Sequence, residues 1–107
     1  MKKHLTILTG ASRGMGLGMA QQLLQPGHTL LCISRKTSAL LADQAASATD
    51  ATLEQWPLDL ADAGPVSIRL KEWLHAQDGS QFASATLINN AAALPKISAL
   101  ADADFGN

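Results

Sequence analysis

With 107 residues the chain forms at most one small domain, and a hydrophobic content of 47% argues against a disordered chain. A net charge of -1 argues against a nucleic-acid-binding surface. The single cysteine, Cys32, argues against a disulfide framework and favours a reducing, cytoplasmic location. The apolar run 5–9 is too short for a signal peptide, and no stretch is long enough to span a bilayer, so we expect no membrane contact.

Short apolar runs alternate with segments of helical spacing. The runs 4–9 and 28–33 are nearly continuous in apolar or β-branched residues, which is typical of parallel strands buried on both faces. The runs 52–57 and 85–88 are predicted as shorter strands. Apolar spacing predicts helices over 14–24, 39–48 and 65–76.

Local signals define how these helices begin, end and pack. Pro26 and Gly27 stop the first helix. Thr37 or Ser38 can cap the second, whose main apolar anchors are predicted to be Leu40 and Leu41. The apolar face of the third is predicted to consist of Val66, Leu70, Trp73 and Leu74. Residues 91–107 are expected to form a loop or short helix.

The alternation of strands and helices predicts an α/β fold with right-handed crossovers. We expect a Rossmann-like, doubly wound parallel sheet in the strand order 3-2-1-4, truncated after about four strands. Residues 1–107 would then form a partial dinucleotide-binding domain. Its ligand crevice would lie at the carboxyl ends of the strands, between the first and the fourth.

A glycine-rich turn follows the first strand. Residues 9–16 read Thr-Gly-Ala-Ser-Arg-Gly-Met-Gly and open into the first helix. Gly10 would allow a tight turn, Gly14 would let a pyrophosphate approach the backbone, and Gly16 would let the helix lie close to the sheet. The N–H groups of the helix N-terminus favour phosphate there. The alternative is a glycine turn without a ligand.

Polar residues follow the other strands at the same predicted edge. They are Ser34 and Arg35 after the second strand, Asp59 after the third, and Asn89 and Asn90 after the fourth. Each would by itself suit an ordinary solvated turn. Their convergence on one edge favours a binding site.

These motifs together resemble the short-chain dehydrogenase/reductase family. The resemblance rests on Thr-Gly-x-x-x-Gly-x-Gly at 9–16, Asp59-Leu60, and Asn89-Asn90-Ala91, in that order. It covers essentially the whole chain. Within the family, the opening and the Ser34-Arg35 turn resemble sepiapterin and benzil reductases.

The resemblance implies roles for these residues. Asp59 would accept a hydrogen bond from the adenine amino group, and the Leu60 N–H would contact the ring. Asn89 would brace the sheet, while Asn90 and Ala91 would line the ribose. The complete set of predicted cofactor-binding residues is Gly10, Ser12, Arg13, Gly14, Met15, Gly16, Ser34, Arg35, Asp59, Leu60, Asn89, Asn90 and Ala91.

The turn after the second strand favours NADP(H) over NAD(H). NAD-preferring sites place an acid there to hold the ribose 2′-hydroxyl. Here Ser34 is followed by Arg35 and Lys36, and Arg13 lies in the glycine loop. Guanidinium groups suit a 2′-phosphate because their paired donors match its oxygens. The alternative is that Arg35 and Lys36 are only solvated turn charges.

Catalytic residues are not predicted. The family uses a Ser, a Tyr-x-x-x-Lys motif and often an Asn, but the sequence contains no tyrosine. We therefore expect the cofactor-binding half of an oxidoreductase acting on a small carbonyl or alcohol, which as a full-length enzyme would be a homo-oligomer. The strand at 85–88 would then be an exposed sheet edge. The alternative is a non-catalytic nucleotide-binding module.

No metal site is predicted, because His4, His28 and His75 are scattered along the sequence. The large aromatic side chains are expected to pack in the core or on a surface rather than to bind a ligand. They are Trp56, Trp73 and Phe82.

Overall fold

The computed structural model describes residues 3–12, 14–59, 61–77 and 79–90. Four strands form one parallel sheet in the order β3-β2-β1-β4. The strands are β1 (Lys3–Thr9), β2 (His28–Ser34), β3 (Thr52–Pro57) and β4 (Phe82–Asn89). The helices are α1 (Gly14–Leu23), α2 (Ala39–Ser47), α3 (Ala63–Ala76) and a short 3-10 turn, η1 (Gly79–Gln81). The predicted fold class and strand order are confirmed.

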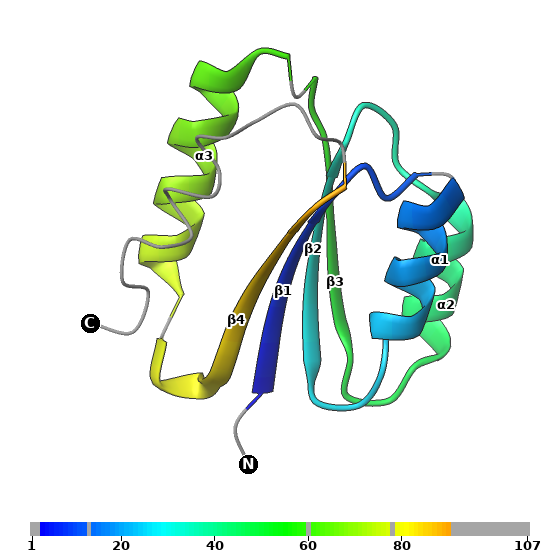
Figure 1. The fold of residues 1–107 in the computed structure, drawn as a ribbon. Coiled ribbons are helices and arrows are strands. Elements are labelled where there is room, and N and C mark those ends of the chain that lie inside the picture. The colour runs from blue at the N-terminus through cyan, green and yellow to red at the C-terminus, as the bar shows by residue number, and fades with distance from the viewer. Residues whose placement is uncertain (1–2, 13, 60, 78, 91–107) are drawn as a thin grey trace.

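Helices cover both faces of the sheet, with α1 and α2 on one face and α3 on the other (Figure 1). Two buried clusters fill the two interfaces. The cluster under α3 comprises Ile7, Leu31, Ile33, Trp56, Val66 and Leu70. The cluster under α1 and α2 comprises Leu8, Ala11, Ala20, Leu24, Leu30, Cys32 and Leu41. The central strands contribute to both clusters, as expected for strands buried on both faces.

The two tryptophans pack as predicted. Trp56 is buried under α3, and its ring meets the Trp73 ring edge-on at a centroid distance of 6.0 Å. The Arg69 guanidinium lies 4.3 Å from the Trp56 ring centroid, on the α3 side. This arrangement combines area burial with a cation–π contact, and it supports a structural role.

One packing prediction is wrong. Leu41 is fully buried, but Leu40 is 53% exposed. Consecutive helical residues point about 100° apart, so only one of the pair can face the sheet, and Ala45 takes the second position. The register of β1 and β2 also brings together two histidines that are far apart in the sequence, with the His4 and His28 ring centroids 5.4 Å apart.

β4 is longer than the predicted 85–88 and begins at Phe82. It pairs along the whole of β1, with a register shift after Lys3. The added residues Ala83 and Ser84 have weak strand propensity; Ser84 pairs with His4 of β1, and Ala83 lies at the register shift. Within the described residues, no strand pairs with the outer edge of β4, and its exposed stretch 83–86 agrees with the predicted open edge. None of the helices in the described ranges has the length and apolar character needed to cross a membrane.

Cys32 provides a test of this packing. Burial raises the pKa of its thiol from 9.0 to about 12. The unfolded chain therefore releases the thiol proton at lower pH than the native state, so this thiol lowers the unfolding free energy between these two pH values. Urea denaturation at pH 8 and at pH 10 measures this change. We expect the unfolding free energy to fall more between the two pH values in the wild type than in Cys32→Ala. Equal losses would contradict the burial of this thiol.

Candidate dinucleotide site

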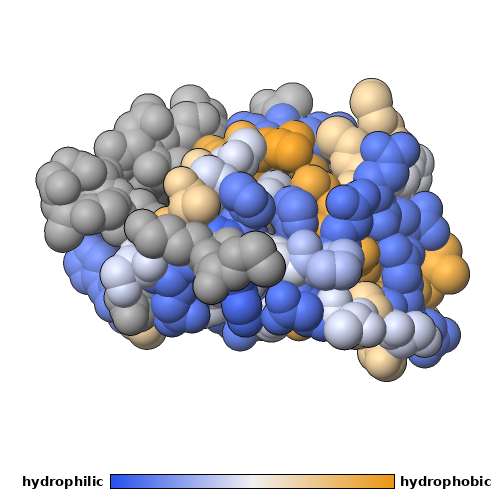
Figure 2. Space-filling view, turned by 90° about the horizontal axis from the view of Figure 1, so that it is seen from below, coloured by the Kyte–Doolittle hydropathy of each residue, from blue (hydrophilic) through white to orange (hydrophobic). Residues whose placement is uncertain are grey.

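The carboxyl ends of all four strands meet at one edge of the sheet. Thr9 of β1 pairs with Ile33 of β2 and with Asn89 of β4, and Ser34 of β2 pairs with Pro57 of β3. The carboxyl ends of the strands point toward the top of the view in Figure 1. The predicted convergence of the motifs on one edge is confirmed, because parallel pairing aligns the strand ends. The opposite end of the sheet presents a mainly hydrophilic surface (Figure 2).

The glycine loop turns sharply between β1 and α1. Gly10 and Gly14 have positive φ values of 71° and 61°, which disfavour residues with a Cβ. The Gly10 N–H donates to the Ile33 carbonyl at 3.0 Å, which ties the start of the loop to β2. A Cβ on Gly14 would meet no atom of the described protein within 4 Å, so the space around this residue is open.

Gly16 is where α1 approaches the sheet most closely. A Cβ there would overlap the Gly10 carbonyl oxygen and lie 2.7 Å from Asn90 Nδ2. The predicted packing role of Gly16 is therefore confirmed. Only glycine lets the first turn of α1 lie against the loop and the end of β4 at this position.

Ser34 supports the loop from the neighbouring strand. Its side chain is buried, and its Oγ accepts the Ala11 N–H at 2.7 Å. Ser34 is one of the predicted cofactor-binding residues, and the structure gives its oxygen a bond within the protein. The bond fixes the loop relative to the end of β2.

Removing this hydroxyl tests the contact. Ser34→Ala leaves the buried Ala11 N–H without its acceptor, which should cost about 1–3 kcal/mol of unfolding free energy. Urea denaturation measures the change. The matched control is Ser47→Ala, which removes an exposed hydroxyl bonded to the Asp43 carbonyl and should change stability by less than about 0.5 kcal/mol. Equal effects of the two variants would contradict the role of Ser34.

The two asparagines connect β4 to the glycine loop. Asn89 Oδ1 accepts the Thr9 hydroxyl at 2.9 Å, and Asn90 Nδ2 donates to the Gly10 carbonyl at 3.1 Å. Asn89 therefore braces neighbouring strand ends, as predicted. Asn90 holds the loop from outside, which adds a structural role to its predicted place beside the ribose.

Asp59 follows β3 in an exposed turn. Its Oδ1 accepts the Ala61 N–H at 2.9 Å, and its carbonyl accepts the Asp62 N–H at 3.0 Å. These bonds are those of a local turn, and a carboxylate retains capacity for further donors. The predicted site residues Arg13, Leu60 and Ala91 lie outside the described residues, as does the region 91–107.

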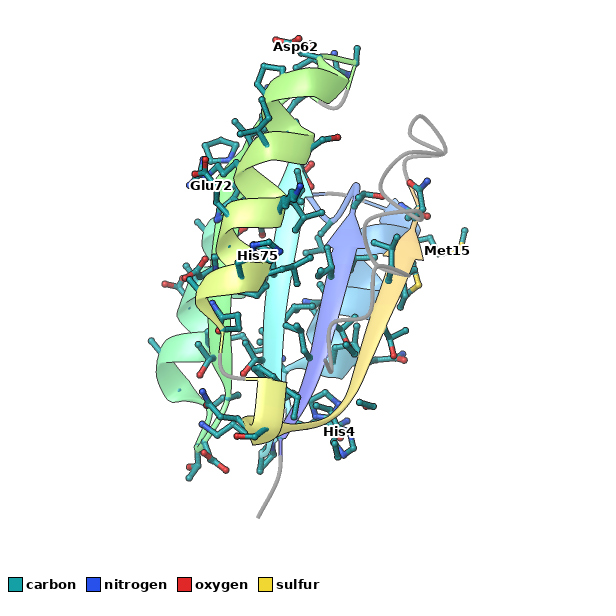
Figure 3. The ribbon with its side chains drawn as sticks, turned by 90° about the vertical axis from the view of Figure 1, so that its left-hand side faces the viewer. His4, Met15, Asp62, Glu72 and His75 are labelled. Atoms are coloured by element: carbon teal, nitrogen blue, oxygen red, sulfur yellow. The ribbon has the colours of Figure 1, made fainter. Side chains whose placement is uncertain are left out.

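The remaining predicted residues lie near the start of α1 and after β2. Ser12 is half-buried, whereas Met15 is 75% exposed. Figure 3 shows Met15 toward the end of the sheet where β4 ends, and His4 at the opposite end. Arg35 and Lys36 are exposed in the turn between β2 and α2.

No family model matches the chain. Over 102 residues it is 29% identical to the benzil reductase ((S)-benzoin forming) of Bacillus subtilis, which covers 95% of this chain and 39% of that protein. A short-chain dehydrogenase/reductase from Burkholderia vietnamiensis is similar in structure, with a TM-score of 0.60 and 31% identity. That match covers 92% of this chain and 50% of the other.

The chain is thus similar in sequence and in structure to a member of the short-chain dehydrogenase/reductase family. A second similar structure is the 3-oxoacyl-[acyl-carrier protein] reductase of Brucella melitensis, solved in complex with NAD. It has a TM-score of 0.57 and 22% identity over 71% of this chain and 30% of its own, which supports the shared fold. The chain thus spans half or less of the length of each of these relatives.

The edge of the sheet where the strands end fits a pyrophosphate group. α1 begins at Gly14 with no acidic residue in its first turn, so its N–H groups offer donors and a partial positive charge without a competing carboxylate. The open space at Gly14 leaves room for a phosphate to approach those donors. Hydrogen bonds from Asn90 and to Ser34 hold the loop in place before any ligand arrives.

One residue beside this edge was missed from the sequence. Gln55 of β3 pairs with Cys32 of β2, in a position that faces α1 and α2. Its side chain hydrogen-bonds the backbone of Ser38, at the end of the turn that carries Arg35 and Lys36. A polar residue two positions after Leu53, on the same face of the strand, was the available signal.

Proposed function

We propose that the chain binds NADP(H) along the carboxyl edge of its sheet. The main support is the glycine loop, in which Gly16 packs against Gly10 and Asn90 while Gly14 remains open at the start of α1. The pyrophosphate would lie on the N–H groups there. Gly10, Ser12, Arg13 and Met15 would complete the loop around it.

The adenosine end would lie toward β2 and β3. Asp59 would accept the adenine amino group, next to the Leu60 N–H, and Asn90 and Ala91 would border the ribose. Asn89 would contribute indirectly by bracing the strand ends, through its bond to Thr9.

The preference for NADP(H) depends on the turn after β2. Arg35 and Lys36 are exposed there, and the first acid after β2 is Asp43, inside α2. Because Ser34 is buried while Arg35 and Lys36 are exposed, these two cations, with Arg13, would carry most of the interaction with a 2′-phosphate.

We further propose that the whole protein is a cytoplasmic, homo-oligomeric oxidoreductase acting on a small carbonyl or alcohol. Support comes from the family and from the benzil reductase match. The bound cofactor would supply or accept a hydride, and this chain would bind and orient it. Residues 1–107 would form the dinucleotide-binding part of one domain.

A second candidate is nucleotide binding without catalysis. The absence of tyrosine from the sequence favours it, because the family's proton donor is then missing from these 107 residues. NADPH oxidation by the full chain with benzil as substrate tests this second candidate directly. We expect no turnover from this chain, and measurable turnover would reject the second candidate.

Fluorescence titration with NADPH and NADH tests the binding proposal. We expect NADPH to bind at least about tenfold more tightly, because a charge-assisted contact to the 2′-phosphate is worth roughly 1.5–3 kcal/mol. Equal or weaker binding of NADPH would reject the cofactor preference. Failure of both dinucleotides to bind would reject the function.

A further inference from the structure

Gln55 makes two complementary hydrogen bonds with a single residue. Its Oε1 accepts the Ser38 N–H at 2.8 Å, and its Nε2 donates to the Ser38 carbonyl at 3.0 Å. Both ends of the amide are therefore satisfied by the backbone of one residue in the turn between β2 and α2. Gln55 is half-buried on the face of β3 that packs against α2, where an unpaired amide would be costly.

Ser38 is also the N-cap of α2. Its Oγ accepts the Leu41 N–H at 3.3 Å, and its carbonyl accepts the Ala42 N–H at 3.2 Å. The position that Gln55 holds is therefore the start of the helix. Moving Ser38 would move the end of the turn and the first turn of α2 together.

The other end of the turn is fixed at Ser34. Its carbonyl accepts the Leu58 N–H at 2.9 Å, and its Oγ accepts the Ala11 N–H at 2.7 Å. Only residues 35–37 lie between the two anchored serines, and all three are exposed. So short a segment has little freedom once both of its ends are fixed.

We propose that Gln55 is a positioning residue for cofactor selectivity. It touches no ligand itself; it fixes Ser38 so that Arg35 and Lys36 are presented to a 2′-phosphate without first having to order the turn. The proposal rests on the NADP(H)-binding function above. Long cationic side chains bind a phosphate more tightly when their backbone is already fixed, because less conformational entropy is lost on binding.

Gln55→Met tests this in the full chain, because methionine keeps the length and approximate volume but cannot bond Ser38. The matched control is Gln44→Met, which removes a comparable bond from Nε2 to the Gln21 carbonyl, outside the 35–38 turn. We expect Gln55→Met to raise the dissociation constant of NADPH about tenfold, because a preorganised contact is lost. The dissociation constant of NADH should change by no more than about twofold. Gln44→Met should leave the ratio of the two dissociation constants unchanged.

A readout without cofactor tests the contact itself. In the free wild type, the Ser38 N–H should exchange slowly with solvent, and Gln55→Met should increase its exchange rate by at least about tenfold. Gln55→Glu serves as the second variant, because it keeps the acceptor for this N–H and loses the donor to the carbonyl. It should retain partial protection while weakening NADPH at least as much, through its added negative charge.

The outcomes separate the inference from the function. Equal weakening of NADPH and NADH would show a merely structural role for Gln55 and overturn the inference. An unchanged ratio in Gln55→Met, with NADPH still bound, would overturn it while leaving the proposed function intact. Failure of the wild type to bind either dinucleotide would overturn both.

Discussion

Gly16→Ala is expected to weaken NADPH binding by about a hundredfold, equivalent to about 2.7 kcal/mol. The added methyl would overlap the Gly10 carbonyl oxygen and lie 2.7 Å from Asn90 Nδ2. Backbone must therefore move, and the N–H groups at the start of α1 move with it. The strain should also lower the unfolding free energy by about 1–3 kcal/mol, which urea denaturation measures.

Gly18→Ala is the matched control, because it adds the same methyl two residues further along α1. A Cβ at Gly18 meets nothing within 4 Å, and its φ is not positive. Alanine should therefore stabilise the helix by about 0.5–1 kcal/mol and leave NADPH affinity unchanged. If both variants bound NADPH as the wild type does, Gly16 would have no role in shaping the site.

The second large effect is expected at the basic turn. Arg35→Ala combined with Lys36→Ala should weaken NADPH about a hundredfold and leave NADH nearly unchanged, because only NADPH carries the 2′-phosphate. The preference of the wild type for NADPH over NADH should also decrease as the salt concentration is raised, because both cations are exposed and salt screens their charges. Parallel titrations with the two dinucleotides measure these changes.

Lys71→Ala is the control for net charge, because Lys71 is an exposed cation on α3, away from the turn. It should change neither dissociation constant by more than about twofold. Equal losses for NADPH and NADH in the Arg35 and Lys36 double variant would mean that the turn does not read the 2′-phosphate.

The architecture could be predicted because its signals are local. The continuous apolar run of β2 requires burial on both faces, and alternation with helices then implies a parallel sheet. Gly27 ends the α1 segment with a φ of 86°, and Ser38 caps α2, as their residue types indicate. From these elements the order β3-β2-β1-β4 follows by ordinary handedness.

The bonds by which Ser34 and Asn90 support the glycine loop could not be predicted, because they join distant segments. Ser34 bonds a residue 23 positions away, and Asn90 bonds one 80 positions away. Such pairs are set by strand register and loop geometry, which no single stretch encodes. Gln55 was missed for the same reason, since its partner Ser38 lies on the far side of a helix along the chain.

The exposure of Leu40 and the early start of β4 differ from the sequence predictions for equally specific reasons. Two adjacent leucines at the start of α2 look equivalent in composition, but helical geometry buries Leu41 and exposes Leu40. Ala83 and Ser84 of β4 carry little strand signal, and the pairing of Ser84 with His4 of β1 could not be inferred from them alone.

The most direct test of the account is to follow backbone amide chemical shifts of the isotope-labelled chain during titration with NADPH. We expect the largest changes at Ala11, Gly14 and Met15 in the glycine loop, and at Arg35 and Lys36 in the turn after β2, with His4 at the opposite end unaffected. NADH should perturb the loop and leave the turn nearly unchanged. Saturating shifts at the opposite end of the sheet, or none at the loop, would contradict the proposed site.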